Sequence, residues 1–193
     1  MTLRVLLVDQ KPDRAEAVAL GLIADGYIVV GTVPSHADIV ELVRTTGADV
    51  IVCDLDHASR DAIDAMSALH RDEPRPVVMF VDRTDPGSTE AAMQAGVAAY
   101  VVEGLAPSRV KAVIDVAVAR FRAHQTLRAE LEEARSALNE RKLVDRAKGI
   151  LMQTRKMSED EAYRTLRRLA MDQGKKLAEA ASNVIAMEKL LKM

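Results

Sequence analysis

Five short, largely apolar runs, separated by stretches with helical spacing, are the feature that most limits how this chain can fold. Runs of this kind form strands that are buried on both faces, which is typical of a parallel sheet covered by helices. The first 120 residues therefore predict an α/β doubly wound five-stranded parallel sheet, which binds ligands at the carboxyl ends of its strands. The expected strands are residues 3–8, 27–30, 49–53, 76–81 and 99–102, and the helices between them are 15–24, 35–45 (with Ser35 as N-cap), 61–70 and 88–95.

A long helix is expected to follow the sheet. After Pro107 neither glycine nor proline occurs again until Gly149. A helix of roughly 40 residues would be about 60 Å long, which is too long to pack on one small sheet. Its apolar residues Leu127, Leu131, Ala134 and Leu138 are spaced 4, 3 and 4 apart, as in a coiled-coil seam. We expect residues 121–139 to form a coiled-coil linker and a homodimer; a solvated helix within one chain is the alternative.

Two further helices complete the chain. Ser158 and Glu161 have the spacing of a capping box, so a helix is expected to begin there and to end at Gly174. Residues 175–191 form the last predicted helix. Together with the end of the long helix they predict a three-helix domain over residues 140–193, after a domain at 1–120. Its expected core residues are Ile150, Leu151, Ala162, Leu166, Leu169, Ala170, Leu177, Ala181, Val184 and Ile185.

Composition excludes several classes of protein. The single cysteine, Cys53, lies in an apolar run and cannot form an internal disulfide, which fits a cytoplasmic location. We expect neither a signal peptide nor a membrane span, because no apolar run is long enough. The chain shows no metal-ligand spacing, no glycine-rich phosphate loop and no pairing of nucleophile and base, so we expect no enzyme.

The modest net charge of −2 conceals an asymmetry. From Glu140 onward the chain carries 13 Lys and Arg against 8 Asp and Glu, whereas the preceding part carries 14 against 21. A basic segment on an acidic body indicates that any polyanionic partner meets the C-terminal region.

The C-terminal region also carries a motif. Its matching elements are Ala-Lys-Gly-Ile-Leu-Met at 147–152, Ala-Tyr at 162–163 and Leu-Arg-Arg-Leu-Ala-Met at 166–171, followed by Leu177, Ala180, Ala181 and Val184. This region resembles the ANTAR domain, the RNA-binding output of the AmiR and NasT transcription antiterminators. The resemblance implies that the protein binds paired hairpins in leader mRNA and prevents a terminator from forming.

RNA binding requires cations for phosphates and groups that meet unpaired bases. Lys148 and Arg168 lie inside the ANTAR-like motif, and we expect the bundle not to need their charge. Tyr163 is either a core residue or a base-stacking platform. Two alternatives to RNA binding remain, a DNA-binding response regulator and a protein that binds only another regulator. The candidate RNA-binding residues are Lys148, Arg155, Lys156, Arg164, Arg167, Arg168, Lys175 and Lys176.

The N-terminal domain carries acidic residues at its strand ends. Asp54 closes the third predicted strand and Asp9 the first, and Asp56 lies close by. This pattern resembles the receiver domain of two-component response regulators. The resemblance implies that Asp54 is the phosphoacceptor candidate, with Asp9 and Asp56 as acidic-pocket candidates. Mg²⁺ is expected only if the site is functional, because it offsets the charge of the phosphoryl group and the carboxylates.

Three positions depart from the receiver pattern. Gln10 replaces the second acidic residue, Val81 has no hydroxyl at the expected Thr or Ser position, and Glu103 replaces the expected lysine. A carboxylate there would repel a phosphoryl group at a cost of about 1–4 kcal/mol at 4 Å. We therefore expect a pseudo-receiver. A phosphorylation-controlled response regulator with ANTAR output is the alternative, and Asp54 as a purely structural residue is another.

Over the whole chain the resemblance is to the NasT branch. The supporting segments are residues 78–82, residues 95–105 and the ANTAR-like motif. This resemblance implies control of nitrate and nitrite assimilation genes, with a nitrate-sensing regulatory protein as the partner that sequesters the regulator. Control of amidase genes, as in AmiR, is the nearest alternative.

Overall fold

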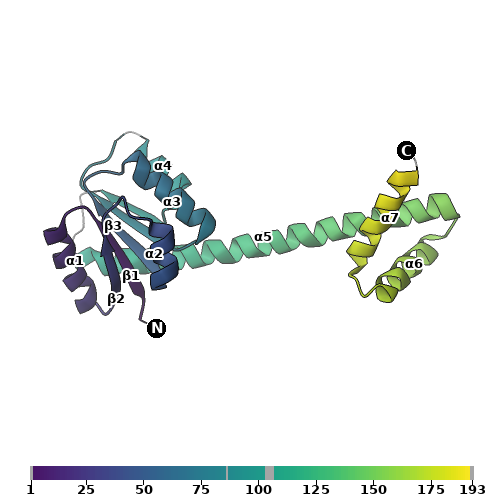
Figure 1. The fold of residues 1–193 in the computed structure, drawn as a ribbon, viewed down its shortest axis with the longest axis horizontal. Coiled ribbons are helices and arrows are strands. Elements are labelled where there is room, and N and C mark those ends of the chain that lie inside the picture. Colours follow the sequence, from purple (N-terminus) through teal and green to yellow (C-terminus); the bar gives the residue numbers. More distant parts are fainter. Residues whose placement is uncertain (1, 86, 103–106, 192–193) are drawn as a thin grey trace. The chain divides into compact units, whose positions relative to one another are not determined.

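The computed structural model describes residues 2–85, 87–102 and 107–191 (Figure 1). The chain forms two compact units, residues 1–125 and residues 126–193, and one helix contributes to both. Among the described residues, no helix is both long enough and apolar enough to cross a membrane.

The first unit contains a five-stranded sheet with all neighbouring strands parallel and the order β2-β1-β3-β4-β5. This arrangement confirms the predicted doubly wound fold. Every residue of β3 and β4 is buried, as the apolar runs predicted. The strands are β1 (Arg4–Asp9), β2 (Ile28–Val33), β3 (Val50–Leu55), β4 (Val77–Val81) and β5 (Ala99–Val102).

Helices cover both faces of the sheet (Figure 1). Side chains of α1 and of the first turns of α5 pack on one face, together with Val52 and Phe80. Side chains of α2, α3 and α4 pack on the other face, against Leu6 and the thiol of Cys53. The helices are α1 (Pro12–Ala24), α2 (Ile39–Thr46), α3 (Arg60–Asp72), α4 (Ser88–Gln94) and α5 (Pro107–Arg155).

Helix α2 begins later than the sequence predicted. Its N-cap is Asp38, whose carboxylate accepts a hydrogen bond from the Glu41 backbone N–H at 3.1 Å. Ser35, the expected cap, lies before the helix and accepts a hydrogen bond from the Gln10 side chain. The prediction was wrong because Asp caps a helix as well as Ser does and lies closer to the first apolar residue, Ile39.

The second unit is a bundle of three helices, made by the end of α5, α6 (Glu159–Asp172) and α7 (Leu177–Leu191). Helix α5 passes through Gly149 and continues to Arg155, so it is longer than predicted. The capping box of Ser158 and Glu161 is present. The core of the bundle is formed by Ala147, Leu166, Ala181 and Ile185, with Leu143, Val144, Ile150, Leu151, Leu177 and Val184 packed around them.

Gly96, between α4 and β5, combines a left-handed backbone with a close neighbour. Its φ is +90°, and a Cβ there would lie 2.4 Å from the His70 ring. Gly26 has the same φ, but a Cβ there would meet nothing within 4 Å.

These two glycines allow a matched test. Both alanine variants carry the backbone cost of a left-handed residue, about 1–2 kcal/mol, but only Gly96→Ala adds a clash with a helix. We expect Gly96→Ala to lower the denaturation midpoint clearly more than Gly26→Ala does in urea unfolding. Equal losses would show that the His70 helix moves aside freely.

Candidate functional site

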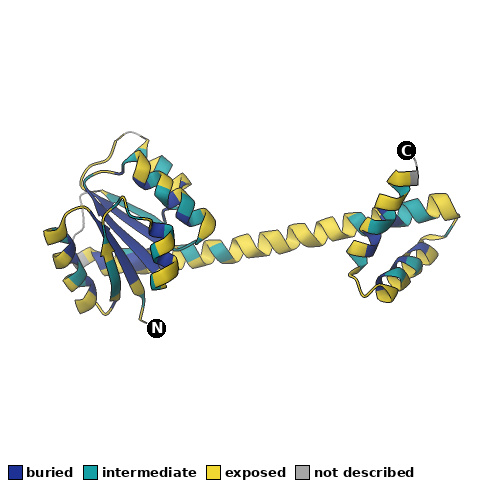
Figure 2. Cartoon of the chain, viewed as in Figure 1, coloured by how far each residue is buried: buried dark blue, intermediate teal, exposed yellow. Residues whose placement is uncertain are grey.

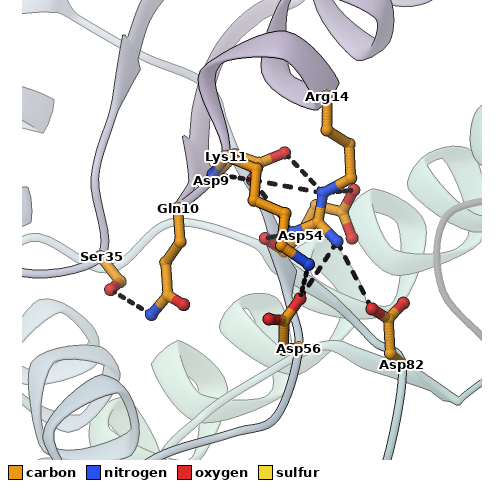
Figure 3. A network of polar contacts seen from close by, with 8 residues as sticks. All are labelled: Asp9, Gln10, Lys11, Arg14, Ser35, Asp54, Asp56 and Asp82. Atoms are coloured by element: carbon orange, nitrogen blue, oxygen red, sulfur yellow. Dashed lines mark hydrogen bonds and ion pairs between the residues drawn. The ribbon is translucent and has the colours of Figure 1, made fainter.

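Four aspartates meet at the carboxyl ends of the central strands (Figure 3). Asp9 ends β1 and is paired in register with Asp54 on β3. Asp56 follows β3, and Asp82 follows β4. Asp9 and Asp54 are 5% and 1% exposed and are the buried charged residues of the described chain. We call Asp9, Asp54, Asp56 and Asp82 the acidic pocket.

A cation from the chain itself occupies this pocket. The guanidinium of Arg14, in the first turn of α1, lies among the four carboxylates (Figure 3). Its Nη2 and Nε donate to the two carboxylate oxygens of Asp9 at 3.0 and 3.1 Å, and Nε lies 3.2 Å from Asp54 Oδ2. Nη1 lies 3.4 Å from Asp56 and 3.5 Å from Asp82. The hydrogen bond to Asp9 raises the pKa of Arg14 further, so the group stays charged.

The neighbouring residues complete this charge arrangement. The Lys11 ammonium lies 2.6 Å from Asp56 and lowers the pKa of that carboxyl. Gln10, by contrast, turns away from the pocket and donates to the Ser35 hydroxyl at 2.8 Å (Figure 3). Relative to the receiver pattern, the pocket therefore lacks one carboxylate, at position 10, and contains two cations of the chain itself, Lys11 and Arg14.

Asp54 is held in an unfavourable environment for a charge. Its Oδ1 is buried without a hydrogen-bond partner in the described structure. Burial raises the pKa of Asp54 to about 6; Arg14 opposes this shift, and the charges of Asp9, Asp82 and Asp56 add to it. The carboxylate that the receiver pattern marks as phosphoacceptor thus already pairs with one cation through Oδ2.

Receiver domains typically use Mg²⁺ for phosphorylation, and this ion requires a particular arrangement of ligands. The carboxylate oxygens are of the right chemical kind, since Mg²⁺ prefers oxygen ligands at 2.0–2.1 Å in octahedral geometry. In this arrangement, however, the oxygens surround the Arg14 nitrogens, and no set of three or more described His, Cys, Asp or Glu residues converges on a metal position. The residues as placed do not fit the ion.

Val81, expected to stand where receivers carry Thr or Ser, is fully buried in the core, and the side chain that reaches the pocket from the end of β4 is Asp82. Glu103 lies outside the described residues. Sequence reasoning did not assign Arg14, Lys11 or Asp82 to this pocket. For Arg14 and Lys11 a signal was available, because these basic residues follow the first strand at the edge of the sheet where the carboxylates meet.

In the second unit, four predicted RNA contacts come together. Arg155, Lys156, Arg164 and Arg168 line a groove of about 500 Å³ with Met157, Glu161 and Thr165. We call this the arginine groove. None of the four cations forms an ion pair with a described residue. Glu161, its one carboxylate, already accepts hydrogen bonds from Ser158, at 2.8 Å from the backbone N–H and 2.9 Å from the hydroxyl.

Lys148 has a different environment. Its side chain is only 16% exposed, and its ammonium lies 2.8 Å from both Asp145 and Glu159. These carboxylates raise its pKa, Asp145 foremost. We expected the bundle core not to need this charge; the structure shows that the ammonium has two carboxylate partners and joins α5 to the first turn of α6.

The other expected contacts lie elsewhere. Lys176 lines a second groove, of about 380 Å³, together with Arg141, Lys148 and Tyr163. Tyr163 is 43% exposed, so the core interpretation was wrong, and base stacking by this ring stays a prediction. Arg167 and Lys175 are exposed but line neither groove.

The predicted coiled-coil seam is exposed. Residues 126–142 of α5 are exposed all round (Figure 2). Leu127, Leu131 and Leu138 expose 63%, 47% and 55% of their surface. In one chain these leucines therefore leave about half or more of their surface in water, which is an unfavourable arrangement for an apolar seam.

The parallel sheet with paired aspartates at the ends of β1 and β3 defines the first unit as a response-regulator receiver. Family comparison agrees, since the response regulator receiver domain matches residues 5–115 and the ANTAR domain matches residues 132–185. This chain therefore belongs to the response regulators that combine a receiver with an ANTAR domain.

Individual relatives match all or part of this chain. The transcriptional regulatory protein PdtaR of Mycobacterium tuberculosis is 31% identical over 182 residues, which cover 94% of this chain and 89% of that protein. The nitrate regulatory protein of Klebsiella oxytoca is 37% identical, but only over 73 residues, 37% of this chain and 18% of its own length. The receiver of NarL from M. tuberculosis superposes with a TM-score of 0.52 at 25% identity, covering 60% of this chain and 96% of that one. Proteins of the receiver–ANTAR family are transcriptional regulators and not enzymes.

The raised pKa of Asp54 predicts a stability effect with a defined sign. The folded state holds this proton more tightly than the unfolded chain, so the contribution of Asp54 to the free energy of unfolding falls as the pH rises from about 4 to about 6. We expect Asp54→Asn to raise the melting temperature above about pH 7, and the gain to close as the pH approaches about 4.

Asp56→Asn is the matched control. The pKa of Asp56 is lowered, so its contribution is present at neutral pH and lost in acid. Melting curves extended well below about pH 4 should therefore separate the two: the gain in Asp54→Asn closes between about pH 6 and 4, whereas the loss in Asp56→Asn stays constant there and closes only in stronger acid. A loss of stability in Asp54→Asn at neutral pH would mean that the attraction to Arg14 outweighs the burial of the carboxylate.

Proposed function

We propose that this protein controls transcription by binding hairpins in leader mRNA through the arginine groove, and so acts as an antiterminator. The carrying observation is that four cations share one concave surface with a single carboxylate, Glu161, and that none of them lies within ion-pair distance of a carboxylate among the described residues. Cations already paired with carboxylates gain little from a phosphate, whereas unpaired ones release counterions from the RNA. The proposed ligand, a nascent transcript, places the action of the protein in the cytoplasm.

The turn at the rim of the groove supports this proposal. Lys156, between α5 and α6, has φ +54°, a conformation that non-glycine residues rarely adopt. Backbone strain of this kind costs about 1–3 kcal/mol and collects at functional sites. Here it brings Arg155 and Lys156 to the same groove as Arg164 and Arg168, which lie four residues apart on α6.

We further propose that the protein works as a homodimer through the exposed seam of α5. The seam residues Leu127, Leu131, Ala134 and Leu138 repeat at coiled-coil spacing on a stretch whose described side chains are all exposed. A dimer carries two arginine grooves, which suits RNA with paired hairpins because the second contact becomes intramolecular.

Control is proposed to come from a sensor protein that binds the regulator, and not from phosphorylation of Asp54. The support is Arg14, which pairs with Asp9 and Asp54 where a phosphorylated receiver needs its metal. Genes of nitrate and nitrite assimilation, with a nitrate-sensing partner, are the first targets to test. The reason is the partial similarity to the K. oxytoca nitrate regulatory protein.

The RNA proposal predicts a graded loss of affinity. Each phosphate contact removed from the arginine groove should reduce the salt slope of binding by about 0.7–0.9. We expect Arg164→Ala and Arg168→Ala to weaken binding to a labelled two-hairpin leader RNA in fluorescence anisotropy across a salt series. Their melting temperatures should stay near that of the wild type, because these exposed side chains have no ion-pair partner among the described residues.

Two controls accompany this measurement. Lys189→Ala removes an exposed charge from the last turn of α7, outside the lining of the groove, and should bind RNA as the wild type does. Matched duplex DNA should compete poorly. If the groove variants bind normally, or if DNA binds as tightly as RNA, the proposal is wrong. Lys148→Ala breaks two ion pairs, so this variant, unlike the groove variants, should have a lower melting temperature than the wild type.

The dimer proposal predicts that charges in the seam separate the chains. Leu131→Asp with Leu138→Asp places carboxylates at two seam positions, and we expect monomers in light scattering. Ala129→Asp with Ser136→Asp adds the same charge at exposed positions of α5 outside the seam and should leave the dimer intact. A wild-type protein that is monomeric at micromolar concentration contradicts the proposal.

The control proposal predicts a nearly silent substitution. Asp54→Asn cannot be phosphorylated, yet it should leave antitermination close to normal in a reporter strain. The measurement compares reporter output with and without the inducing signal. Loss of regulation in Asp54→Asn, restored by Asp54→Glu as a phosphoryl mimic, would establish phosphorylation as the input.

A further inference from the structure

We propose that Arg14 is a built-in cation that keeps divalent metal ions out of the acidic pocket. The pocket is thus a metal site that the chain has filled with its own side chain. This inference rests on the receiver unit alone and does not depend on RNA binding.

The first argument is the position of the guanidinium. Its three nitrogens are 3.0–3.5 Å from carboxylate oxygens of all four pocket aspartates (Figure 3). An ion bound to the same oxygens would have to lie between them, with bonds of about 2.1 Å. The guanidinium already fills that space, so an ion can enter only after Arg14 has left.

The second argument is that Arg14 is held firmly. Its Nη2 also donates to the backbone carbonyl of Asp54 at 2.9 Å, a directional bond besides the charge pairing. Its helix is anchored to the sheet by Ala15, Val18 and Leu22, which are buried in the core. The Lys11 backbone N–H fixes the Asp9 carboxylate from the other side at 2.8 Å.

The third argument is competition. A tethered cation binds intramolecularly, so its effective concentration is in the millimolar range or above and does not change with the medium. Mg²⁺, by contrast, must give up tightly held water before it binds carboxylates. Arg14 also stays charged at every accessible pH. Replacing Arg14 by the ion would therefore have two costs. The charge-assisted hydrogen bonds of Arg14 would break, and the ion would lose part of its tightly held water.

A second cation reinforces the exclusion. Lys11 pairs with Asp56 at 2.6 Å, so two positive charges face four carboxylates. The two cations are not equivalent, however. Arg14 contacts the buried pair Asp9 and Asp54, whereas Lys11 contacts only Asp56, whose side chain is one-third exposed. Removing Arg14 should open the pocket, and removing Lys11 should not.

The test is titration of the full-length protein with Mn²⁺, with free ion measured by electron paramagnetic resonance. We expect the wild type and Lys11→Ala to show no saturable site below about 1 mM, in the weak range of carboxylate sites. Arg14→Ala should bind Mn²⁺ at least about tenfold more tightly, which corresponds to 1.4 kcal/mol. Adding Asp54→Asn to Arg14→Ala should abolish this site.

Thermal melting supplies an independent readout. Arg14→Ala leaves buried carboxylates unpaired, so its melting temperature should rise with Mg²⁺ while that of the wild type stays constant. Arg14→Gln, which keeps a polar side chain of similar length, serves as the second variant if Arg14→Ala does not fold. If neither folds, the wild-type titration decides: no saturable site supports the inference, and binding below 1 mM overturns it. Equal Mn²⁺ affinity of the wild type and either Arg14 variant also overturns it.

Discussion

The receiver unit depends on the pairing of one arginine with two buried aspartates. Asp9 and Asp54 are neighbours in register on the two central strands, and both are withdrawn from water. Two adjacent buried carboxylates repel each other and lose their hydration, which is tolerable only with a cation at hydrogen-bond distance. Arg14 supplies that cation from the first turn of α1. Removing Arg14 would leave both carboxylates buried without this cation, at a cost of about 3–5 kcal/mol, so the position of α1 and the charge state of the pocket are fixed together.

The sheet itself could be predicted because its signals are local. Each buried strand is a continuous apolar run, and the stretches between them have helical spacing, so order and direction follow from few rules. Asp9 and Asp54 could be placed at the same edge for this reason, since parallel strands end on one side. At the end of β4 the pattern did not show which side chain reaches the pocket, because alternation along a strand decides which side chain faces a site. Val81 points into the core, and Asp82 reaches the pocket.

Arg14 could not be predicted in the same way. It is five residues from Asp9 and 40 from Asp54 along the chain, and no periodicity links the three. Its sequence neighbours, Lys11 and Asp13, suggest an ordinary charged helix start. Only the packed structure shows that the first turn of α1 directs this side chain over the strand ends (Figure 3). The same limit applied to Lys148. Its position in the helical pattern could not show that the chain folds back and brings Glu159, eleven residues later, within hydrogen-bond distance.

Helix α5 restricts how a signal can pass through this protein. Its first turns supply Val110, Ile114 and Ala117 to the receiver core, and its last turns supply Val144 and Ala147 to the bundle core. Both ends are therefore fixed by packing, and interiors resist small shifts. The stretch between them, residues 126–142, has no core of its own. Exchanging the protein that binds this exposed stretch thus costs less free energy than rearranging the packed core of either unit.

If the acidic pocket is closed to metal, the proposed regulation needs an input other than phosphorylation, such as a change in the protein that binds the exposed stretch of α5. A sensor protein that covers the seam of α5 would compete with the second copy of the chain, because the same leucines cannot be buried twice. Loss of the dimer would leave one arginine groove per particle, and the advantage of binding paired hairpins would disappear. Such a mechanism converts partner binding directly into RNA affinity and requires no movement inside the receiver.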